Sequence, residues 1–297
     1  MRGAMIESSF DATDARFDRL NPPSDATTAD QQQIVVPFLK WAGGKRWLAS
    51  HLRELIGEVK GNYIEPFLGS AAVFFAVQPQ SAVLSDRNRE LVGAYRALQI
   101  QHKAVERYLA EHQKQHCETH YYKVRNSIPD TFAKRAARFI YLNRTCWNGL
   151  YRVNLNGHFN VPIGTKTTVV METDDFMRIS EVLRCANISH SDFQIPVSQA
   201  KAGDVVFCDP PYTVRHNRNG FVKYNEDLFS WADQIRLRDT LRVARDRGAR
   251  IFVTNANHES VRDLYCSDFE IREFERYSSI GGANAVRGNY SELLITG

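Results

Sequence analysis

Helical and strand patterns alternate along most of the chain. Apolar residues recur at helical spacing over 48–56, and a short strand pattern over 62–64 follows. A helical pattern over 71–77 then leads to a second strand over 82–84, which ends at Asp86. A strand, a helix and a second strand in this order predict a parallel α/β sheet.

The segment 91–142 interrupts this alternation, because it has a long helical period and almost no strand pattern. We interpret it as an inserted helical domain. The elements predicted after it are a helix over 174–185, strands over 187–190 and 205–208, a helix over 228–247, a strand over 250–254, a helix over 259–265, and terminal strands over 269–277 and 292–296. Residues 1–33 combine many polar residues with few aliphatics and are expected to form a disordered extension.

The motif Asp209-Pro-Pro-Tyr212 directly follows the apolar strand over 205–208, at the carboxyl edge where open α/β sheets bind ligands. The N6 amine of adenine is a poor nucleophile, because its lone pair is delocalised into the ring. The Asp209 carboxylate and the Pro210 carbonyl can accept its two N–H groups if Pro210 and Pro211 hold the loop out of regular structure. Tyr212 offers a face on which an extruded base can stack. The competing interpretation is a proline-rich turn with a capping aspartate.

A second motif, Glu65-Pro-Phe67-Leu-Gly69, precedes Asp86, which lies 21 positions after Glu65. An acidic residue at the end of the next strand is where α/β sites bind ribose hydroxyls. The loop lacks the G-x-G-x-x-G pattern, so a dinucleotide is disfavoured, whereas S-adenosylmethionine has no phosphate to hold. Taken alone, the motif fits an ordinary strand-to-helix turn equally well.

A third motif, Trp41-Ala-Gly-Gly-Lys45, resembles a phosphate-binding loop but fails its pattern. Leu39 replaces the first glycine, and Arg46 replaces the serine or threonine. The paired glycines suit close approach of a ligand to the backbone, and Lys45 can hold the carboxylate of a methionine moiety or a DNA group. The alternative is a capped helix start.

Charge is distributed unevenly although the net charge of the 297 residues is only +4. Residues 94–171 contain 12 Lys and Arg against 4 Asp and Glu, a local charge of +8 that predicts a docking surface for phosphates. The alternative is that these charges solvate helix faces.

The five cysteines are scattered without C-x-x-C spacing, and no signal segment or apolar run long enough for a bilayer is present, so we expect a cytosolic protein with reduced thiols.

His112, His116 and His120 recur every four residues within the basic segment, with Cys117 nearby. This spacing raises the possibility of a metal-binding helix face. No catalytic acid accompanies the histidines as in H-E-x-x-H, so we interpret the segment as a solvated or DNA-facing helix and predict no metal.

With these motifs assembled, the chain resembles the Dam-type (D12 class) family of adenine-N6 DNA methyltransferases. The three motifs, the strand that ends in aspartate and the helical insertion occur in the family's order, and the resemblance runs from about Phe38 to the C-terminus. It includes three further segments, which are 141–152, 157–164 and 220–224.

The resemblance implies a Rossmann-like methyltransferase sheet, mostly parallel with an antiparallel C-terminal strand. The catalytic domain would comprise residues 34–90 and 172–297, and residues 91–171 would form an inserted helical and hairpin domain for target recognition. The catalytic residues would be Asp209, Pro210, Pro211 and Tyr212. S-adenosylmethionine would be bound by Trp41, Lys45, Glu65, Phe67, Gly69, Asp86 and Asp209, and its adenine ring by Asp192 and Phe193.

The DNA-reading hairpin of the family corresponds to residues 147–165. Trp147 is similar to the aromatic that fills the space left by the flipped base. The other DNA contacts implied are Asn148, Leu150, Arg152, Asn154, Pro162 and Lys166. Family members that read GATC usually have an arginine where this chain has Thr165, an exchange that removes a bidentate guanine contact, so GATC recognition does not follow.

The sequence therefore predicts a monomeric methyltransferase acting on N6 of a flipped adenine in double-stranded DNA. In this interpretation the loop after Tyr212, with Arg215, His216, Arg218 and Lys223, orders over the target strand. A restriction endonuclease is a possible partner, and a membrane is not. The alternatives are methylation of cytosine N4 or of RNA adenine, and a DNA-binding regulator without turnover.

Overall fold

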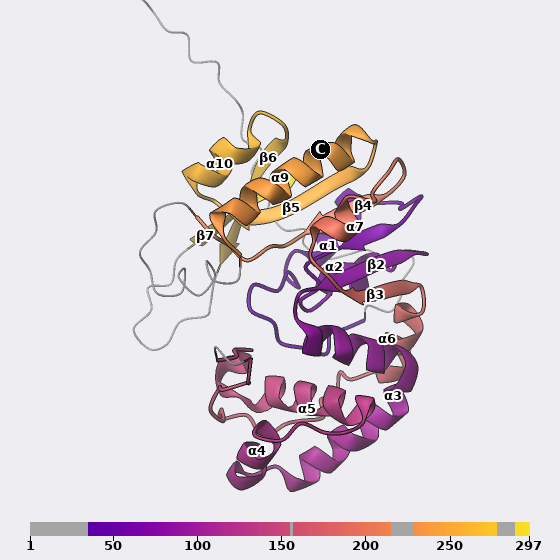
Figure 1. The fold of residues 1–297 in the computed structure, drawn as a ribbon, viewed down its shortest axis with the longest axis vertical. Helices are drawn as coiled ribbons and strands as arrows, with labels where there is room; N and C mark the ends of the chain where they lie inside the picture. Colours follow the sequence, from indigo (N-terminus) through magenta and orange to yellow (C-terminus); the bar gives the residue numbers. More distant parts are fainter. Residues whose placement is uncertain (1–34, 155–156, 215–228, 278–288) are drawn as a thin grey trace, which may run out of the picture.

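Seven strands pair into one sheet in the order β3-β2-β1-β4-β5-β7-β6 (Figure 1). The structure, a computed structural model, describes residues 35–154, 157–214, 229–277 and 289–297. The strands are β1 (Tyr63–Glu65), β2 (Ala82–Asp86), β3 (Ala186–His190), β4 (Val205–Cys208), β5 (Arg250–Ala256), β6 (Glu270–Tyr277) and β7 (Asn289–Thr296). The first five strands pair in parallel, and β7 runs antiparallel between β5 and β6, which confirms the predicted fold class.

The helices also follow the predicted order. They are α1 (Ala49–Ile56), α2 (Ala72–Val77), α3 (Arg89–Gln115), α4 (Glu118–Arg125), α5 (Phe132–Thr145), η1 (Trp147–Gly149), α6 (Phe176–Leu183), α7 (Gln194–Val197), α9 (Trp231–Asp246) and α10 (Glu259–Tyr265). The sequence analysis did not predict α7 or the short 3-10 turn η1. Within the described ranges, no helix is long and apolar enough to span a bilayer. The predicted extension 1–33 and the loop over 215–228 lie outside the described residues.

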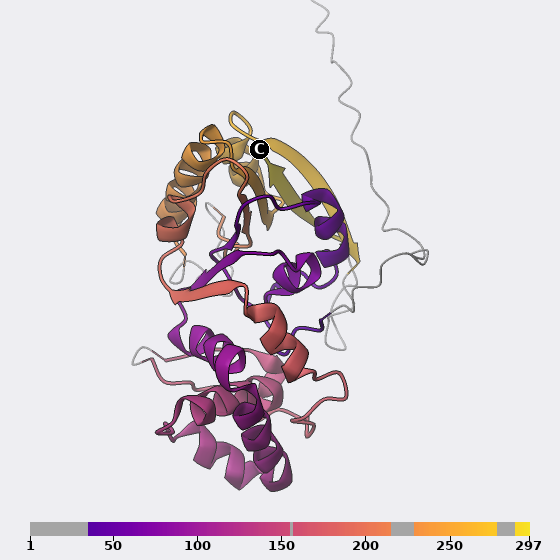
Figure 2. The same ribbon diagram turned by 90° about the vertical axis from the view of Figure 1, so that its right-hand side faces the viewer.

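Strand β4 shows why the apolar pattern produces a buried sheet. All four of its residues are buried, as expected for a parallel strand covered on both faces. Val205 and Phe207 pack into one core with α1 and α2, whereas Val206 and Cys208 pack into a second core with α9 and α10. Figure 2 shows these two pairs of helices on opposite faces of the sheet.

The chain reverses its direction across the sheet between β1 and β4. It runs outward from β1 through β2 to β3, and then returns to place β4 and β5 on the other side of β1. The carboxyl ends of β1 and β4 are therefore neighbours at a topological switch point, the usual place for a ligand in this architecture. The predicted motifs at 65–69 and 209–212 follow these two strand ends.

Helices α3, α4 and α5 form a separate layer below the sheet (Figure 1). Helix α3 is capped by the Asn88 side chain and bends at Gln101, and it packs on α5 and also on β2 and β3. The chain leaves α5 through η1 into a hairpin that is closed by the isolated bridges Cys146↔Ile163 and Val153↔Phe159. The domain boundaries at residues 91 and 171 stay a prediction, since α3 is continuous from one region to the other.

Arg144 at the end of α5 fastens the helical layer to the rest of the chain. Its guanidinium donates to both carboxylate oxygens of Asp174 at 2.6 Å and to the Phe38 carbonyl at 2.9 Å. It also donates to the Val169 carbonyl at 2.6 Å. Because this buried charge is fully paired, the region that carries the hairpin is tied to the segment that leads into Trp41.

Candidate active site

Asp209 lies at the switch point and is held from two sides. Its Oδ1 atom is 2.8 Å from Lys45 Nζ and accepts a hydrogen bond of 2.7 Å from the Thr254 hydroxyl on β5. Burial raises the pKa of the Asp209 carboxyl, and the ammonium of Lys45 opposes that shift. The described residues make no hydrogen bond to Oδ2, so this oxygen is available as an acceptor.

Lys45 is buried and also lies close to a second carboxylate, which is half-buried. Its side chain is 2% exposed, and Nζ lies 3.5 Å from Glu292 Oε2 and donates to the Gly43 carbonyl at 2.6 Å. The motif 41–45 therefore contributes its lysine to the same cluster as Asp209. The turn that precedes α1 points this side chain inward, so the lysine acts as a fixed charge and not as a solvated one.

Tyr212 joins the cluster through its hydroxyl and its ring. The hydroxyl donates to Glu292 Oε2 at 2.8 Å, and Lys45 Nζ lies 4.8 Å from the ring centroid. The side chain is half-buried, so part of the ring remains accessible. Pro210 is buried and Pro211 is half-buried, and among the described residues no hydrogen bond reaches the Pro210 carbonyl. The loop thus presents two acceptors beside an aromatic face.

Glu292 and Thr254 are site residues that the sequence analysis missed. Glu292 pairs with Ala256 in the antiparallel register of β7 against β5. Because β7 runs antiparallel to β5, β7 begins beside the end of β5. The first residues of β7 therefore lie at the carboxyl edge of the sheet. The signal in the sequence was one acidic residue at the start of an apolar run, which became informative only when the pairing was known.

Glu65 lies beneath the cluster at the end of β1. It is 3% exposed and accepts a hydrogen bond of 2.8 Å from the Tyr63 hydroxyl on its own strand. Burial raises its pKa to about 8. The hydrogen bond from Tyr63 opposes this rise, and the negative charges of Asp209 and Asp86 add to it. At neutral pH this carboxyl is therefore mostly protonated, and it can donate as well as accept.

Asp86 at the end of β2 holds the turn over 65–69 through Gly69, a contact that the sequence analysis did not predict. Its carboxylate accepts from the Gly69 N–H at 3.3 Å and from the Asn88 N–H at 2.8 Å. Burial raises its pKa, and these backbone bonds counteract the rise. Gly69 has a φ of 45°, and a Cβ there would lie 3.0 Å from Trp41 Cδ1, so this position requires glycine.

Trp41 connects this turn to the hairpin that follows η1. Its ring stacks on Tyr151 with 5.7 Å between centroids and contacts Phe139 of α5 at 6.3 Å. The Tyr151 hydroxyl in turn donates to Glu90 at the start of α3 at 2.7 Å. A residue expected to bind the cofactor therefore also packs against the hairpin.

The pair expected for the cofactor's adenine ring, Asp192 and Phe193, lies between β3 and α7. Phe193 is 1% exposed and stacks on Phe67, with 5.5 Å between ring centroids. Phe67 is half-buried and is the ring of this pair that a ligand can reach. Asp192 is half-buried and paired with Arg236 at 2.6 Å, a partner that the sequence analysis did not identify.

The hairpin presents the residues expected to contact DNA. Trp147 is 55% exposed, which is unusual for so large an aromatic, and its backbone N–H donates to the Pro162 carbonyl at 3.0 Å. Asn148 has a φ of 56°, a left-handed conformation that turns the chain sharply behind Trp147. The remaining expected contacts are half-buried at Leu150 and exposed at Arg152, Asn154, Pro162 and Lys166.

The three histidines of the basic segment surround Tyr141. His112 stacks on its ring with 4.7 Å between centroids, and His116 Nδ1 lies 2.9 Å from its hydroxyl. His112 and His120 are joined by their ring nitrogens at 3.0 Å, and burial lowers the pKa of both. The segment is therefore a half-buried contact between α3, α4 and α5 and not a solvated helix face, which corrects that interpretation. Within the described ranges, no cluster of three or more His, Cys, Asp or Glu has an arrangement that could hold a metal ion.

The mostly parallel sheet, with an aspartate-proline-proline-tyrosine loop at its switch point, defines an α/β methyltransferase fold. The family model of the D12 class N6 adenine-specific DNA methyltransferase matches residues 41–280, so the chain belongs to this family and is an adenine-specific DNA methyltransferase.

Related proteins match over most of their own length. The type II methyltransferase M1.LlaDCHI of Lactococcus lactis subsp. cremoris is 35% identical over 88% of this chain and 94% of its own. The type II methyltransferase M.MjaIII of Methanocaldococcus jannaschii is 36% identical over 88% of this chain and 98% of its own. The retron Ec67 DNA adenine methylase of Escherichia coli is 31% identical over 86% and 90%, respectively.

Proposed function

We propose that the enzyme transfers the methyl group of S-adenosylmethionine to N6 of an adenine flipped out of duplex DNA. The observation that carries this proposal is the arrangement at Asp209. Lys45 and Thr254 both bind Oδ1, and Oδ2 remains as an acceptor beside the Pro210 carbonyl. An exocyclic amine has two N–H groups and can donate one to each oxygen.

These two acceptors address the main obstacle to the reaction. When both N–H groups are held, the nitrogen is drawn towards tetrahedral geometry and its lone pair leaves conjugation with the ring. Lys45 favours the ionised form of the half-buried Asp209 carboxylate, because a positive charge at 2.8 Å stabilises it. Tyr212 would stack on the base, and its hydroxyl is fixed by Glu292 at 2.8 Å.

The residues around the turn over 65–69 fit S-adenosylmethionine. Asp86 provides a carboxylate for ribose hydroxyls at the end of β2, Phe67 provides an apolar face for adenine, and Gly69 permits close approach of the backbone. Trp41, Glu65, Asp192 and Phe193 would complete this site. The bound cofactor supplies an electrophilic methyl on a sulfonium centre, which needs alignment and no metal activation.

The hairpin and the basic helical layer would hold the duplex. The exposed side chain of Trp147 would enter the space that the flipped adenine leaves, and the local excess of positive charge would attract the backbone phosphates. Arg152, Asn154 and Lys166 are exposed near Trp147 in sequence and would contact bases or phosphates.

One chain carries all these parts, so we propose a monomer that acts in the cytoplasm, where it associates with the nucleoid. Because two relatives are named type II methyltransferases, a restriction endonuclease is the candidate partner.

Product analysis tests this function directly. The purified protein is incubated with duplex DNA and labelled S-adenosylmethionine, and the DNA is digested to nucleosides. We expect all of the label in N6-methyl-2′-deoxyadenosine, and no transfer of label when an RNA duplex replaces the DNA. Label in cytosine or in RNA adenine would reassign the substrate, and DNA binding without any transfer would identify a regulator.

A further inference from the structure

Arg236 on α9 holds the turn that follows β3. Its Nη1 atom donates to Asp192 Oδ1 at 2.6 Å, and its Nη2 atom donates to Asp192 Oδ2 at 3.0 Å. The guanidinium carbon also lies 4.1 Å from the centroid of the Phe193 ring. One side chain thus contacts both residues expected at the adenine ring of the cofactor, one through a bidentate pair and the other through a cation–π contact.

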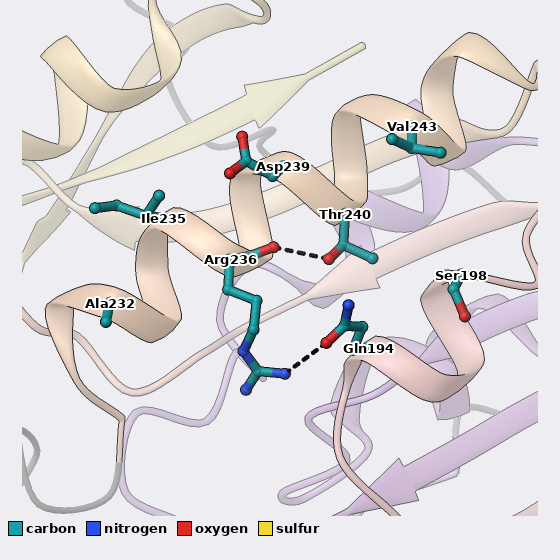
Figure 3. Close-up of a pocket in the computed structure, with 8 residues that line it drawn as sticks. All are labelled: Gln194, Ser198, Ala232, Ile235, Arg236, Asp239, Thr240 and Val243. Carbon is teal, nitrogen blue, oxygen red and sulfur yellow. Dashed lines mark hydrogen bonds between the residues drawn. The ribbon is translucent and has the colours of Figure 1, made fainter.

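Two further contacts fix the guanidinium itself. Nη1 donates to Gln194 Oε1 at 3.0 Å, as Figure 3 shows, and Nη2 donates to Asp233 Oδ1 at 2.8 Å. Asp233 closes the capping box of α9 with Ser230. The arginine is therefore anchored to the first turn of α9 on one side and to α7 on the other. Lysine could not make this pattern, because it lacks a planar fork of donors.

The Asp192 carboxylate retains capacity for a ligand. A carboxylate has about four lone-pair positions, and the described bonds occupy three of them. Oδ1 accepts from Arg236 and from the Gln194 N–H at 3.0 Å, whereas Oδ2 accepts only from Arg236. The side chain is 29% exposed, so the remaining position on Oδ2 is open to a donor such as the exocyclic amine of an adenine ring.

Phe193 links Arg236 to Phe67, the aromatic ring that a ligand can reach. Its ring contacts the guanidinium of Arg236 and also stacks on the ring of Phe67, with 5.5 Å between centroids. Phe229, just before α9, contacts both rings at 5.5 and 5.8 Å. The position of Phe67 is thus set by a stack that begins at Arg236.

We propose that Arg236 is a positioning residue for the adenine end of the methyl donor. It orients the Asp192 carboxylate towards the adenine amine and supports the Phe193–Phe67 stack from behind. This inference rests on the function proposed above and deepens it, because it assigns to α9 a role in cofactor affinity at a distance from the reacting methyl group.

Calorimetric titration tests the role without turnover. S-adenosylmethionine and S-adenosylhomocysteine are titrated into the wild type, Arg236→Gln, Arg236→Lys and the control Arg238→Gln. Arg238 lies two residues further along α9 and pairs with Asp239 at 2.8 Å. We expect Arg236→Gln to raise both dissociation constants about tenfold or more, as for a lost charge-assisted bond, Arg236→Lys to rescue only part of this, and Arg238→Gln to have no effect.

Kinetics and a double-variant cycle separate positioning from general stability. In single-turnover reactions saturated with cofactor, Arg236→Gln should keep a rate within about twofold of wild type, since the reacting atoms are untouched. Combining Arg236→Gln with Asp192→Asn should weaken binding by less than the sum of the single effects. Unchanged cofactor affinity in a folded Arg236→Gln protein, or equal weakening by Arg238→Gln, would overturn the inference. If the wild type binds no S-adenosylmethionine, the proposed function itself fails.

Discussion

Lys45 Nζ lies 2.8 Å from Asp209 Oδ1, and the lysine side chain is 2% exposed. The half-buried carboxylate of Asp209 offsets the desolvation cost of the buried Lys45 ammonium. The pair also orients Asp209, because with Thr254 it occupies one carboxylate oxygen and leaves the other for substrate.

Replacing Lys45 with methionine should reduce the transfer rate and shift its pH dependence. Burial already raises the pKa of Asp209, and loss of the ammonium removes the main opposing effect, so the pKa rises further. Since Asp209 must be ionised to accept the amine, the acidic limb of the pH–rate profile should move to higher pH. Single-turnover rates across pH measure this, with exposed Lys60→Met as the control; an unmoved limb would contradict the assignment.

Variants of Tyr212 should separate its ring from its hydroxyl. Tyr212→Phe removes the bond to Glu292 but keeps the stacking face, and we expect a small loss of activity. Tyr212→Ala also removes the stacking, which is about 1–3 kcal/mol per base, and should reduce kcat/KM by roughly tenfold more. Equal losses in the two variants would show that the ring does not contact the target base.

The hydroxyl of Tyr212 should be coupled to Glu292. Glu292→Ala removes this acceptor, so a further change of Tyr212 to phenylalanine should reduce kcat/KM by less than the same change does in the wild type. The four rates of this double-variant cycle give the coupling directly. Fully additive effects would indicate that Glu292 acts only through Lys45, at 3.5 Å.

Trp147 should matter for base flipping and not for folding. The side chain is 55% exposed, so Trp147→Ala should leave the melting temperature unchanged while slowing methylation of a normal duplex. A target adenine opposite an abasic site needs less unstacking and should restore much of the rate. Fluorescence of 2-aminopurine at the target position reports the flipped population, and exposed Trp47→Ala is the control. Equal slowing on both duplexes would contradict a wedge role.

Glu65 should make the protein less stable as pH rises. Burial raises its folded-state pKa to about 8 from an ordinary value of 4.5, so between these values the folded state binds one proton more than the unfolded state. Stability from this group is present below about pH 4.5 and is lost as pH rises towards 8, by up to about 1.4 kcal/mol per pH unit. Glu65→Gln should flatten this dependence in urea unfolding, whereas exposed Glu58→Gln should not. A steep fall that persists in Glu65→Gln would assign it to other groups.

The sheet and the position of Asp209 could be predicted because both depend on local patterns. The run over 205–208 is wholly apolar, so it marks a strand buried on both faces, and the residue after it must lie at the carboxyl edge. Asp86 followed from the same reasoning applied to β2. These predictions needed only the position of each strand and of its last residue, which the local apolar pattern supplies.

Other site residues depend on pairings that sequence periodicity does not contain. Glu292 reaches the cluster through the register of β7 against β5, and Arg236 reaches Asp192 across 44 positions. The histidines at 112, 116 and 120 have the spacing of one helix face, yet α3 ends between them and they pack around Tyr141. Tertiary packing decided each of these positions.

The most direct test of the central claim is the rate of a single methyl transfer by Asp209→Ala, with cofactor and duplex bound at saturation. If Asp209 directs the amine, this rate should fall about 10³-fold or more even when cofactor and duplex are present at concentrations that saturate the variant. Methylation of N6 at an undiminished rate in that variant would contradict the account, since the acceptor at the switch point would then have no part in the transfer.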